Sequence, residues 1–266
     1  MRLDVIDLSH WQTKEPDFVR ARAAGLVGVI LKATEGTGYT DPTFAKRKKA
    51  VQDAGLGYAS YHFLKHGSVA QQISRYLSVA KPVTGERVVI DYEDVACNLA
   101  DLRTAVTAIQ LADTSLQITV YGGSKLKEEL KSHDALLATT SLWLAQYTAG
   151  TPSWPKATWP VYSLWQYSDG QAGGTPRTMA GFQGQFDCNE FNGTQEACRA
   201  WFKKDSASPT EPADYSGNNY PVGSAEWLQT ELNRRGATPQ LKVDGIEGKS
   251  TLAATRAFAV EQLKKG

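Results

Sequence analysis

Short runs of β-branched and other apolar residues alternate along the chain with longer stretches in which apolar residues recur every three or four positions. The short runs have the length of strands in a sheet covered on both faces, and the longer stretches have the period of amphipathic helices. Gly25 and Gly55 follow two of the longer stretches, where glycine can end a helix. The predicted strands are residues 3–8, 27–31, 56–63, 87–92, 118–121, 141–147, 161–167 and 184–186. The predicted helices are residues 17–24, 42–54, 69–80, 99–112 and 126–130.

The order of these elements is that of an α/β protein in which helices connect parallel strands. Eight strand candidates within about 190 residues predict a β/α barrel, smaller than the roughly 250 residues of a regular one. Residues 148–160 are rich in Pro, Trp and Thr, and residues 168–181 are rich in Gly, so neither segment predicts a crossover helix. Because parallel neighbours need such a crossover, some of the late strands should pair antiparallel. We therefore expect an irregular β/α barrel.

The composition changes after the last predicted strand. Residues 206–222 are rich in Ser, Pro, Thr, Gly and Asn and contain few large apolar groups, which predicts a linker. Beyond it, Ser224 and Ser250 can each cap a short helix. About 45 residues can bury only a small core. The sequence thus predicts a barrel domain over residues 1–205 and a small C-terminal helical domain over residues 223–266.

Composition and charge narrow the classes of partner. The chain has 266 residues, of which 41% are hydrophobic and 21% charged, and its formal net charge is +1. These values are typical of a globular protein and give no electrostatic reason to expect nucleic acid or an anionic membrane as a partner. The basic run at residues 46–49 is typical of a solvated helix face.

The N-terminus and the cysteines bear on the compartment. The first residues lack the basic-then-apolar pattern of a secretory signal, and no apolar run is long enough to span a bilayer. We therefore expect synthesis in a cytosol without membrane insertion. Cys97, Cys188 and Cys198 form neither a closely spaced metal-binding pair nor an even disulfide set. We expect reduced thiols, with a bridge between Cys188 and Cys198 as the alternative.

Four acidic residues lie at or beside the ends of predicted strands: Asp7, Asp91, Glu93 and Asp187. In a β/α barrel the carboxyl ends of the strands meet at one rim, where active sites lie. Asp91 and Glu93 are two residues apart, so on an extended strand they would face the same side about 6.6 Å apart. Asp7 or Asp187 alone would more often belong to a surface loop, and the Asp91–Glu93 stretch alone could equally be a strand that runs into a solvated acidic loop. Their coincidence at one rim predicts an active site.

Aromatic residues occupy the strands that should surround these acids, namely Tyr61, Tyr121, Trp143, Tyr147, Trp165 and Tyr167. Aromatic faces offer a stacking surface, and Tyr hydroxyl groups also form hydrogen bonds. Each one alone is more often a core residue, but beside clustered acids they indicate a carbohydrate cleft. His62 could line the rim or could be a hydrogen-bonded structural residue. The sequence has no Gly-rich nucleotide motif, phosphate loop or metal-binding His or Cys spacing, so we expect neither cofactor nor metal.

Five segments taken together resemble glycoside hydrolase family 25, the lysozymes or N-acetylmuramidases that are frequent among bacteriophage endolysins. They are Asp-Leu-Ser-His-Trp-Gln at 7–12, Tyr-His-Phe at 61–63, Asp-Tyr-Glu at 91–93, Leu-Trp-Gln-Tyr at 164–167 and Phe-Asp-Cys-Asn at 186–189. They occur in the family's order within residues 1–203. The resemblance implies Glu93 as the general acid, with Asp91 assisting and Asp7 and Asp187 completing the acidic centre. It also implies a substrate-binding set of Tyr61, Tyr121, Trp143, Gln146 and Trp165.

The same resemblance implies a substrate and a setting. The substrate is bacterial peptidoglycan, cut at the β-1,4 bond between N-acetylmuramic acid and N-acetylglucosamine. We expect a monomer that is made in the host cytoplasm and reaches the wall after release by a holin. The C-terminal segment resembles a small helical peptidoglycan-binding domain, with Trp227 and Asp244 as its marker residues.

Alternatives of function and of mechanism stay open on the sequence. A chitinase-like N-acetylglucosaminidase also uses an Asp-x-Glu strand end, although Glu86 and Val89 occupy its two upstream acidic positions. A catalytically silent cell-wall binding protein could have kept the barrel. The estimated 6.6 Å exceeds the roughly 5–5.5 Å of covalent retaining enzymes and falls within the roughly 6.5–9.5 Å of inverting ones. We favour a third route, in which the substrate's acetamido oxygen attacks the anomeric carbon while Asp91 steadies the resulting ion.

Overall fold

The protein is described by a computed structural model that divides into two compact units, Met1–Ser206 and Ala207–Gly266. The described residues are 1–203 in the first unit and 229, 232, 233, 238, 240–243, 250 and 254 in the second. In the second unit Gln229, Leu232 and Asn233 are helical. The predicted linker, Trp227 and Asp244 lie outside the described residues, so these predictions stay predictions.

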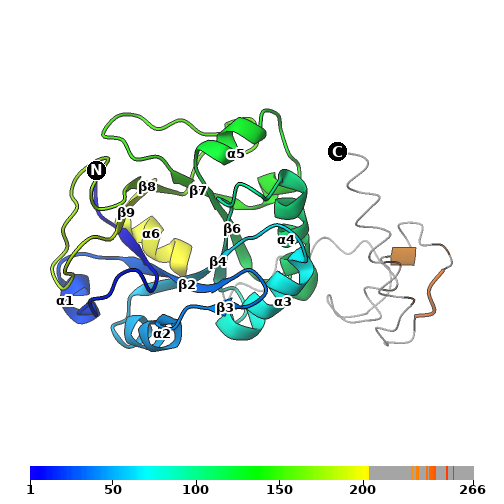
Figure 1. The fold of residues 1–266 in the computed structure, drawn as a ribbon, viewed down its shortest axis with the longest axis horizontal. Helices are drawn as coiled ribbons and strands as arrows, with labels where there is room; N and C mark the ends of the chain where they lie inside the picture. Colours follow the sequence, from blue (N-terminus) through cyan, green and yellow to red (C-terminus); the bar gives the residue numbers. More distant parts are fainter. Residues whose placement is uncertain are drawn as a thin grey trace. The chain divides into compact units, whose positions relative to one another are not determined.

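Eight strands of the first unit close into a barrel, which confirms the predicted fold class (Figure 1). Around the barrel the order is β1, β9, β8, β7, β6, β5, β4 and β2, and β1 pairs with β2 to close it. A two-residue strand, β3 (Tyr39–Thr40), pairs antiparallel with the end of β2. The barrel strands are β1 (Val5–Leu8), β2 (Gly28–Glu35), β4 (Gly57–Phe63), β5 (Arg87–Asp91), β6 (Gln117–Gly122), β7 (Ser141–Ala145), β8 (Leu164–Ser168) and β9 (Asp187–Phe191).

The irregularity of the barrel lies in β9, which pairs antiparallel with both of its neighbours, β8 and β1. The other neighbouring barrel strands are parallel, so the expectation of an antiparallel late strand is confirmed for one strand. The predicted bounds of this strand, 184–186, are wrong. Gly184 has a φ of 80°, which is incompatible with an extended strand, and the strand begins only at Asp187.

Helices surround the barrel, and Figure 1 shows α1 to α5 at its periphery. A further helix, α6, follows the last strand and was not predicted from the sequence; Thr194 caps it by accepting a hydrogen bond from the Ala197 N–H. In the described part of the chain, no helix is both long and apolar enough to cross a membrane. The helices are α1 (Phe18–Ala23), α2 (Phe44–Asp53), α3 (Val69–Ala80), α4 (Leu99–Ala112), α5 (Ser124–Glu129) and α6 (Gln195–Phe202), with a short 3-10 helix, η1 (Leu137–Thr139).

Alternation along the strands divides the apolar residues into two layers. The layer between barrel and helices includes Ile6, Val29 and Ile90. The layer inside the barrel includes Val5, Ile30, Ala59, Val89 and Leu164, and it continues into α6 through Cys198 and Phe202. The barrel interior is therefore a packed core. A binding or active site can lie only at the ends of the barrel.

Helix α6 closes the amino-terminal end of the barrel. The Phe202 ring lies against the backbone of Gly28 and Gly57, where an added Cβ would clash with it. The Arg87 guanidinium stacks on Trp201 at 4.0 Å from the ring centroid and donates to the Trp201 carbonyl oxygen at 3.1 Å. Glycine at the start of β2 and β4 thus makes room for an aromatic plug at this end.

The three cysteines are buried and free. Cys188 lies in the outer apolar layer and Cys198 in the inner one, so the alternative of a bridge between them is wrong and the expectation of reduced thiols is confirmed. Burial raises the pKa of each of these two thiols to about 12, which keeps them protonated at neutral pH.

Candidate active site

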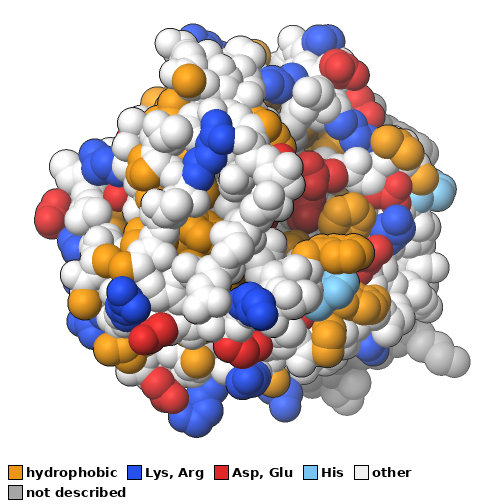
Figure 2. Space-filling model, turned by 60° about the vertical axis from the view of Figure 1, so that its left-hand side comes forward, with side chains coloured by type: hydrophobic (Ala, Val, Ile, Leu, Met, Phe, Trp, Pro, Cys, Tyr) orange, Lys and Arg blue, Asp and Glu red, His pale blue; other side chains and the backbone are white. Residues whose placement is uncertain are grey.

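The inner faces of the strands carry polar residues at the carboxyl end of the barrel. Two positions beyond Val5, Ile30, Ala59, Val89 and Leu164, the same strand faces carry Asp7, Lys32, Tyr61, Asp91 and Gln166. Because side chains alternate along a strand, these residues follow the inner core and open into one pocket of about 220 Å³. Figure 2 shows acidic side chains in a hollow bordered by hydrophobic side chains. The pocket is also lined by Ser9, Trp11, Gln12, Phe63, Glu93, Tyr121, Trp143, Tyr147 and Asp187.

The pocket brings together all four predicted acids. Asp7 at the end of β1 lies directly opposite Asp187 in the antiparallel β1–β9 pair. Because β9 runs antiparallel, its first residue reaches the rim where the other strands end. Strand β5 ends at Asp91, so Glu93 lies in the following loop and not on the strand extension that the sequence suggested. Glu93 nevertheless faces the pocket.

Asp7 is held in place by side-chain amides from two neighbouring strands. Its Oδ2 accepts hydrogen bonds from Asn189 Nδ2 at 2.8 Å and from Gln166 Nε2 at 3.1 Å. Both amides are oriented by aromatic donors, since Trp143 Nε1 donates to Asn189 Oδ1 and the Tyr121 hydroxyl donates to Gln166 Oε1, each at 2.7 Å. Two predicted aromatic residues therefore belong to the pocket wall and also fix the acid.

Burial raises the pKa of every acid in the pocket, and repulsion by neighbouring acids adds to this at Asp91, Glu93 and Asp187. Burial, partly offset by the two amide hydrogen bonds, raises the pKa of Asp7 to about 6. Burial and the Asp7 charge raise the pKa of Asp187 to about 9. Burial and the Glu93 charge raise the pKa of Asp91 well above its usual range. Although Glu93 is exposed at the mouth of the pocket, partial desolvation by the walls and the Asp7 charge raise its pKa too. The pocket therefore holds at least one proton at neutral pH, on Asp187.

Lys32 is the basic residue among those that line the pocket. Its ammonium group forms an ion pair with Glu35 at 2.7 Å and lowers the pKa of Asp91, in opposition to burial. Oδ1 of Asp91 is buried without a hydrogen-bond partner among the described residues. An unpaired buried carboxylate oxygen is ready to accept a hydrogen bond from a ligand. Among the side chains that the structure describes, no group of three His, Cys, Asp or Glu residues is arranged to hold a metal ion.

The structure places two of the predicted substrate-binding residues away from the pocket. Trp165 packs in the outer apolar layer, and its Nε1 donates to the Gln146 carbonyl oxygen at 2.8 Å. The Gln146 side chain accepts hydrogen bonds from Lys127 and from the Ser153 N–H, and it does not line the pocket. The reason is strand parity, because Leu164 and Gln166 face inward while Trp165 between them faces outward. Gln166 takes the place that the sequence analysis gave to Trp165.

The sequence also does not indicate which residue holds the loop that follows β1 in place. Trp11 in this loop lines the pocket and has 76% of its surface exposed. Arg47, within the basic run of α2, is buried, not solvated. Its guanidinium donates to the Ser9 carbonyl oxygen at 2.7 Å and to that of Gln12. Because Arg47 lies between two lysines in the sequence, the local pattern does not indicate this role.

His62 is a structural residue. It is fully buried, with Nδ1 at 2.8 Å from the Thr34 hydroxyl and Nε2 at 3.2 Å from Gln72 Oε1. Burial lowers its pKa to about 4, so the ring is neutral over the usual working range. Of the two interpretations offered by the sequence, the structural one is confirmed.

A closed barrel with four acids and several aromatic side chains at its carboxyl rim defines the class of a carbohydrate-cleaving barrel enzyme. The family model of glycosyl hydrolases family 25 matches residues 6–174, and the chain belongs to this family. Lysozyme M1 of Streptomyces globisporus is 26% identical over 207 residues, which cover 71% of this chain and 67% of that protein. The N,O-diacetylmuramidase of Chalaropsis sp is 27% identical over 188 residues, 63% of this chain and 89% of that protein.

Solved structures confirm the fold. The structure of the CTP1L endolysin matches with a TM-score of 0.60 at 17% identity and covers 98% of this chain and 99% of that chain. This level of identity shows a shared fold. The resemblance of residues 1–203 to glycoside hydrolase family 25 is therefore confirmed by the family model, and the barrel fold agrees with it.

Proposed function

We propose that the protein is a lysozyme, a peptidoglycan hydrolase that cuts the β-1,4 bond between N-acetylmuramic acid and N-acetylglucosamine. The observation that carries this proposal is the pocket in which Asp7, Asp91, Glu93 and Asp187 converge, in a chain of glycosyl hydrolases family 25. The names of its relatives, a lysozyme and a diacetylmuramidase, agree with it. A pocket of about 220 Å³ is small for a ligand site, so it suits one sugar ring of a polymer that continues over the rim.

In the proposed mechanism Glu93 is the general acid. Its raised pKa and its place at the mouth of the pocket suit a carboxyl group that gives its proton to the glycosidic oxygen as the bond to the anomeric carbon breaks. The carbonyl oxygen of the substrate's acetamido group then bonds to the anomeric carbon. Water attacks that carbon next, releases its proton to the Glu93 carboxylate and restores the acetamido group.

Asp91 assists this step by holding the acetamido group. Its unpaired Oδ1 can accept the acetamido N–H, and its negative charge stabilises the positive charge that develops on the oxazolinium-like ion. Lys32 favours this charged form of Asp91, whereas burial opposes it. Two successive displacements at the anomeric carbon retain the β configuration of the product.

The test uses purified bacterial cell walls and the full chain. Loss of turbidity with accumulation of reducing N-acetylmuramic acid ends, identified by mass spectrometry, is the expected result. Reducing N-acetylglucosamine ends, or cleavage of chitin oligosaccharides instead of walls, would replace the proposal with the chitinase-like alternative. Wall binding without any new reducing ends would establish the silent binding protein. The anomeric form of the first product, read by NMR, separates the routes, since an α product requires direct attack by water.

We also propose that residues 223–266 bind peptidoglycan through a helical domain that includes Trp227 and Asp244, behind a linker at 206–222. The support is the sequence pattern and the composition of the linker. A shortened chain of residues 1–205 should cut soluble glycan fragments at the parent's rate yet clear intact walls more slowly, because a second attachment raises local enzyme concentration. A chain of residues 220–266 should co-sediment with peptidoglycan without cutting it. If it stays in the supernatant with every wall type, the binding role is withdrawn.

We propose further that the enzyme belongs to a phage lysis system, acts as a monomer and needs a holin to reach the wall. The support is the resemblance of the chain to endolysins. Expression of the chain alone should leave host cells intact until their membrane is permeabilised, for example by chloroform. Lysis at the same rate without permeabilisation would contradict the need for a holin.

A further inference from the structure

Glu93 lies in a loop between β5 and α4, so its position depends on how the two neighbouring residues are held. Tyr92 on one side is fully buried. Its backbone N–H donates to the Tyr121 carbonyl oxygen at 2.9 Å, and its hydroxyl donates to Glu129 on α5. The chain that enters Glu93 is therefore fixed from the barrel side.

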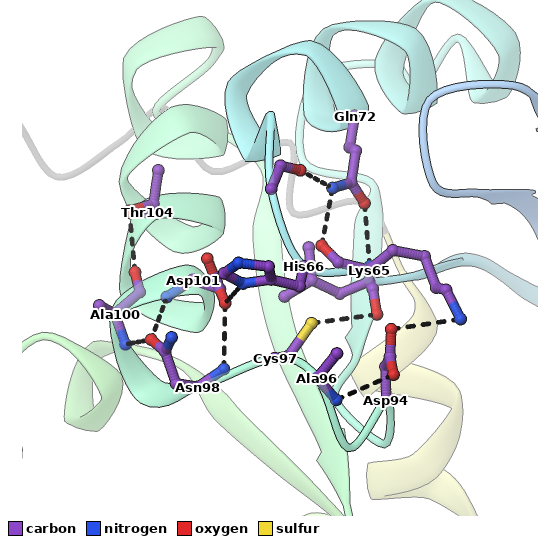
Figure 3. A network of polar contacts seen from close by, with 12 residues as sticks. Lys65, His66, Gln72, Asp94, Ala96, Cys97, Asn98, Ala100, Asp101 and Thr104 are labelled. Carbon is purple, nitrogen blue, oxygen red and sulfur yellow. Dashed lines mark hydrogen bonds and ion pairs between the residues drawn. The ribbon is translucent and has the colours of Figure 1, made fainter.

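The residue after Glu93 is held from another loop. Asp94 Oδ2 forms an ion pair with Lys65 Nζ at 3.2 Å, and Asp94 Oδ1 accepts the Ala96 N–H at 3.1 Å (Figure 3). The backbone of Lys65 is itself fixed on both of its polar groups by the Gln72 side chain, at 3.0 Å to the N–H and 2.7 Å to the carbonyl oxygen. The ion pair thus connects the loop that carries Glu93 to a rigid point at the end of β4.

We propose that Asp94 and Lys65 are positioning residues for the reaction: their ion pair holds the loop so that the Glu93 carboxyl group reaches the glycosidic oxygen. This inference rests on the proposed role of Glu93. An ion pair with a 45% exposed lysine contributes little to stability. A displacement of about 1 Å in a reacting group, however, can cost about 100-fold in rate. The pair should therefore matter for catalysis much more than for folding.

A second ion pair from the same loop provides a matched control. His66 Nδ1 lies 2.9 Å from Asp101 Oδ2, with side-chain exposures of 58% and 14%, close to the 45% and 11% of Lys65 and Asp94. Asp101 belongs to the first turn of α4, where it also accepts the Asn98 N–H at 3.0 Å. Figure 3 shows the two pairs side by side. They differ in that only the Lys65 pair holds the residue next to Glu93.

The experiment measures hydrolysis of the soluble tetrasaccharide of alternating N-acetylglucosamine and N-acetylmuramic acid by the full chain. Asp94→Asn keeps an oxygen for the Ala96 N–H but loses the ion pair, and Lys65→Met keeps the length of the side chain. Each should lower kcat about 10- to 100-fold with KM within twofold and Tm within about 4 °C. Lys65→Arg keeps the positive charge, so its kcat should stay within threefold of that of the parent. His66→Gln should leave kcat within twofold of the parent.

The double variant Lys65→Met with Asp94→Asn should be no slower than either single variant, because the two residues act as one unit. The pH profile separates position from charge: loss of position lowers the plateau without moving the limbs, whereas an effect of charge would move the basic limb in opposite directions in the two variants. A rise of KM at constant kcat would make Lys65 a substrate contact and overturn the inference. So would kcat values equal to that of His66→Gln. An inactive parent would instead overturn the proposed function itself.

Discussion

Each end of the barrel contains a buried acid, but the two acids differ in their hydrogen bonds. At the amino-terminal end Asp4 is fully buried, and its carboxylate accepts hydrogen bonds from Arg2, Gln195 and the Phe191 N–H. At the carboxyl end Asp91 is similarly buried, but one of its oxygens lacks a partner within the described residues. Both ends thus bury an acid, and these two acids differ in that the Asp4 carboxylate is hydrogen-bonded, whereas Asp91, which lines the acidic pocket, keeps one oxygen without a partner among the described residues.

The amino-terminal end of the barrel serves stability, and the carboxyl end serves chemistry. The amino-terminal end is filled by Phe202 and Trp201 of α6. The carboxyl end leaves a pocket in which four acids repel one another, an arrangement that costs stability and is useful only if a ligand or a reaction employs it. Substitutions at the two ends should therefore have opposite consequences for activity and for folding.

The largest effect is expected for Glu93→Gln, which removes the ionisable proton with little change in shape. General acid catalysis contributes about 100- to 10,000-fold, so kcat on soluble glycan should fall by that factor while Tm stays within about 2 °C of the parent. The matched control is Glu190→Gln on β9, whose carboxylate accepts the Arg2 N–H at the opposite end of the barrel. That variant should keep full activity. Activity of Glu93→Gln within tenfold of the parent would show that another residue supplies the proton.

The next largest effect is expected on stability, at the amino-terminal end of the barrel where the Phe202 ring packs. A Cβ added at Gly57 would lie 2.6 Å from two Phe202 ring carbons, closer than real Cβ contacts, so Gly57→Ala forces the ring or the strand to move. Overpacking of this kind costs about 1–3 kcal/mol in the free energy of unfolding. The measurement is urea denaturation, and kcat of the folded fraction should remain that of the parent.

Gly38→Ala is the control for this change, because an added Cβ there meets no atom within 4 Å. Its free energy of unfolding should stay within about 0.5 kcal/mol of the parent. Equal stability of Gly57→Ala and Gly38→Ala would mean that α6 does not pack tightly under the barrel.

Sequence reasoning located the fold and the acids because both follow from periodic patterns. A continuous apolar run such as Val88–Val89–Ile90 predicts a buried strand whatever its neighbours are, and β5 lies within the predicted range. Strand parity then fixes which side of the barrel each residue faces. This is why Asp7, Asp91 and Tyr61 were found at the pocket.

The predictions that the structure corrects concern residues whose positions depend on tertiary contacts and not on the local sequence pattern. Glu93 faces the pocket from a loop that is held by Tyr92 and Asp94. The alternation of side chains along a strand does not apply to a loop, so it cannot predict this orientation. The aromatic ring of Trp165 suggests a place at the pocket, but strand parity with Leu164 places Gln166 there. Arg47 looked solvated among lysines because its partners, two carbonyl oxygens after β1, are about 35 residues distant in the chain. Side chains that act across the fold leave little local signal.

The smallest effect expected is a gain in stability from Asp187→Asn. The folded-state pKa of Asp187, about 9, lies above the ordinary value of 3.8, so the folded protein binds this proton more tightly than the unfolded chain does. The stability that results is fully present below pH 4 and is lost as the pH rises through about 9. Asparagine has no proton to lose, so the variant should match the parent near pH 4 and exceed its Tm increasingly up to pH 9.

A Tm difference of about 2–4 °C at pH 9 corresponds to roughly 1 kcal/mol for a domain of this size. The control is Asp53→Asn, since Asp53 is an exposed acid in an i,i+4 pair with Lys49 on α2, and its effect on Tm should be small without growing with pH. A Tm of Asp187→Asn below that of the parent at every pH would mean that the carboxylate stabilises the rim. In that case the acids of the pocket would be mutually supported, and the contrast between the two ends of the barrel would lie in their packing alone.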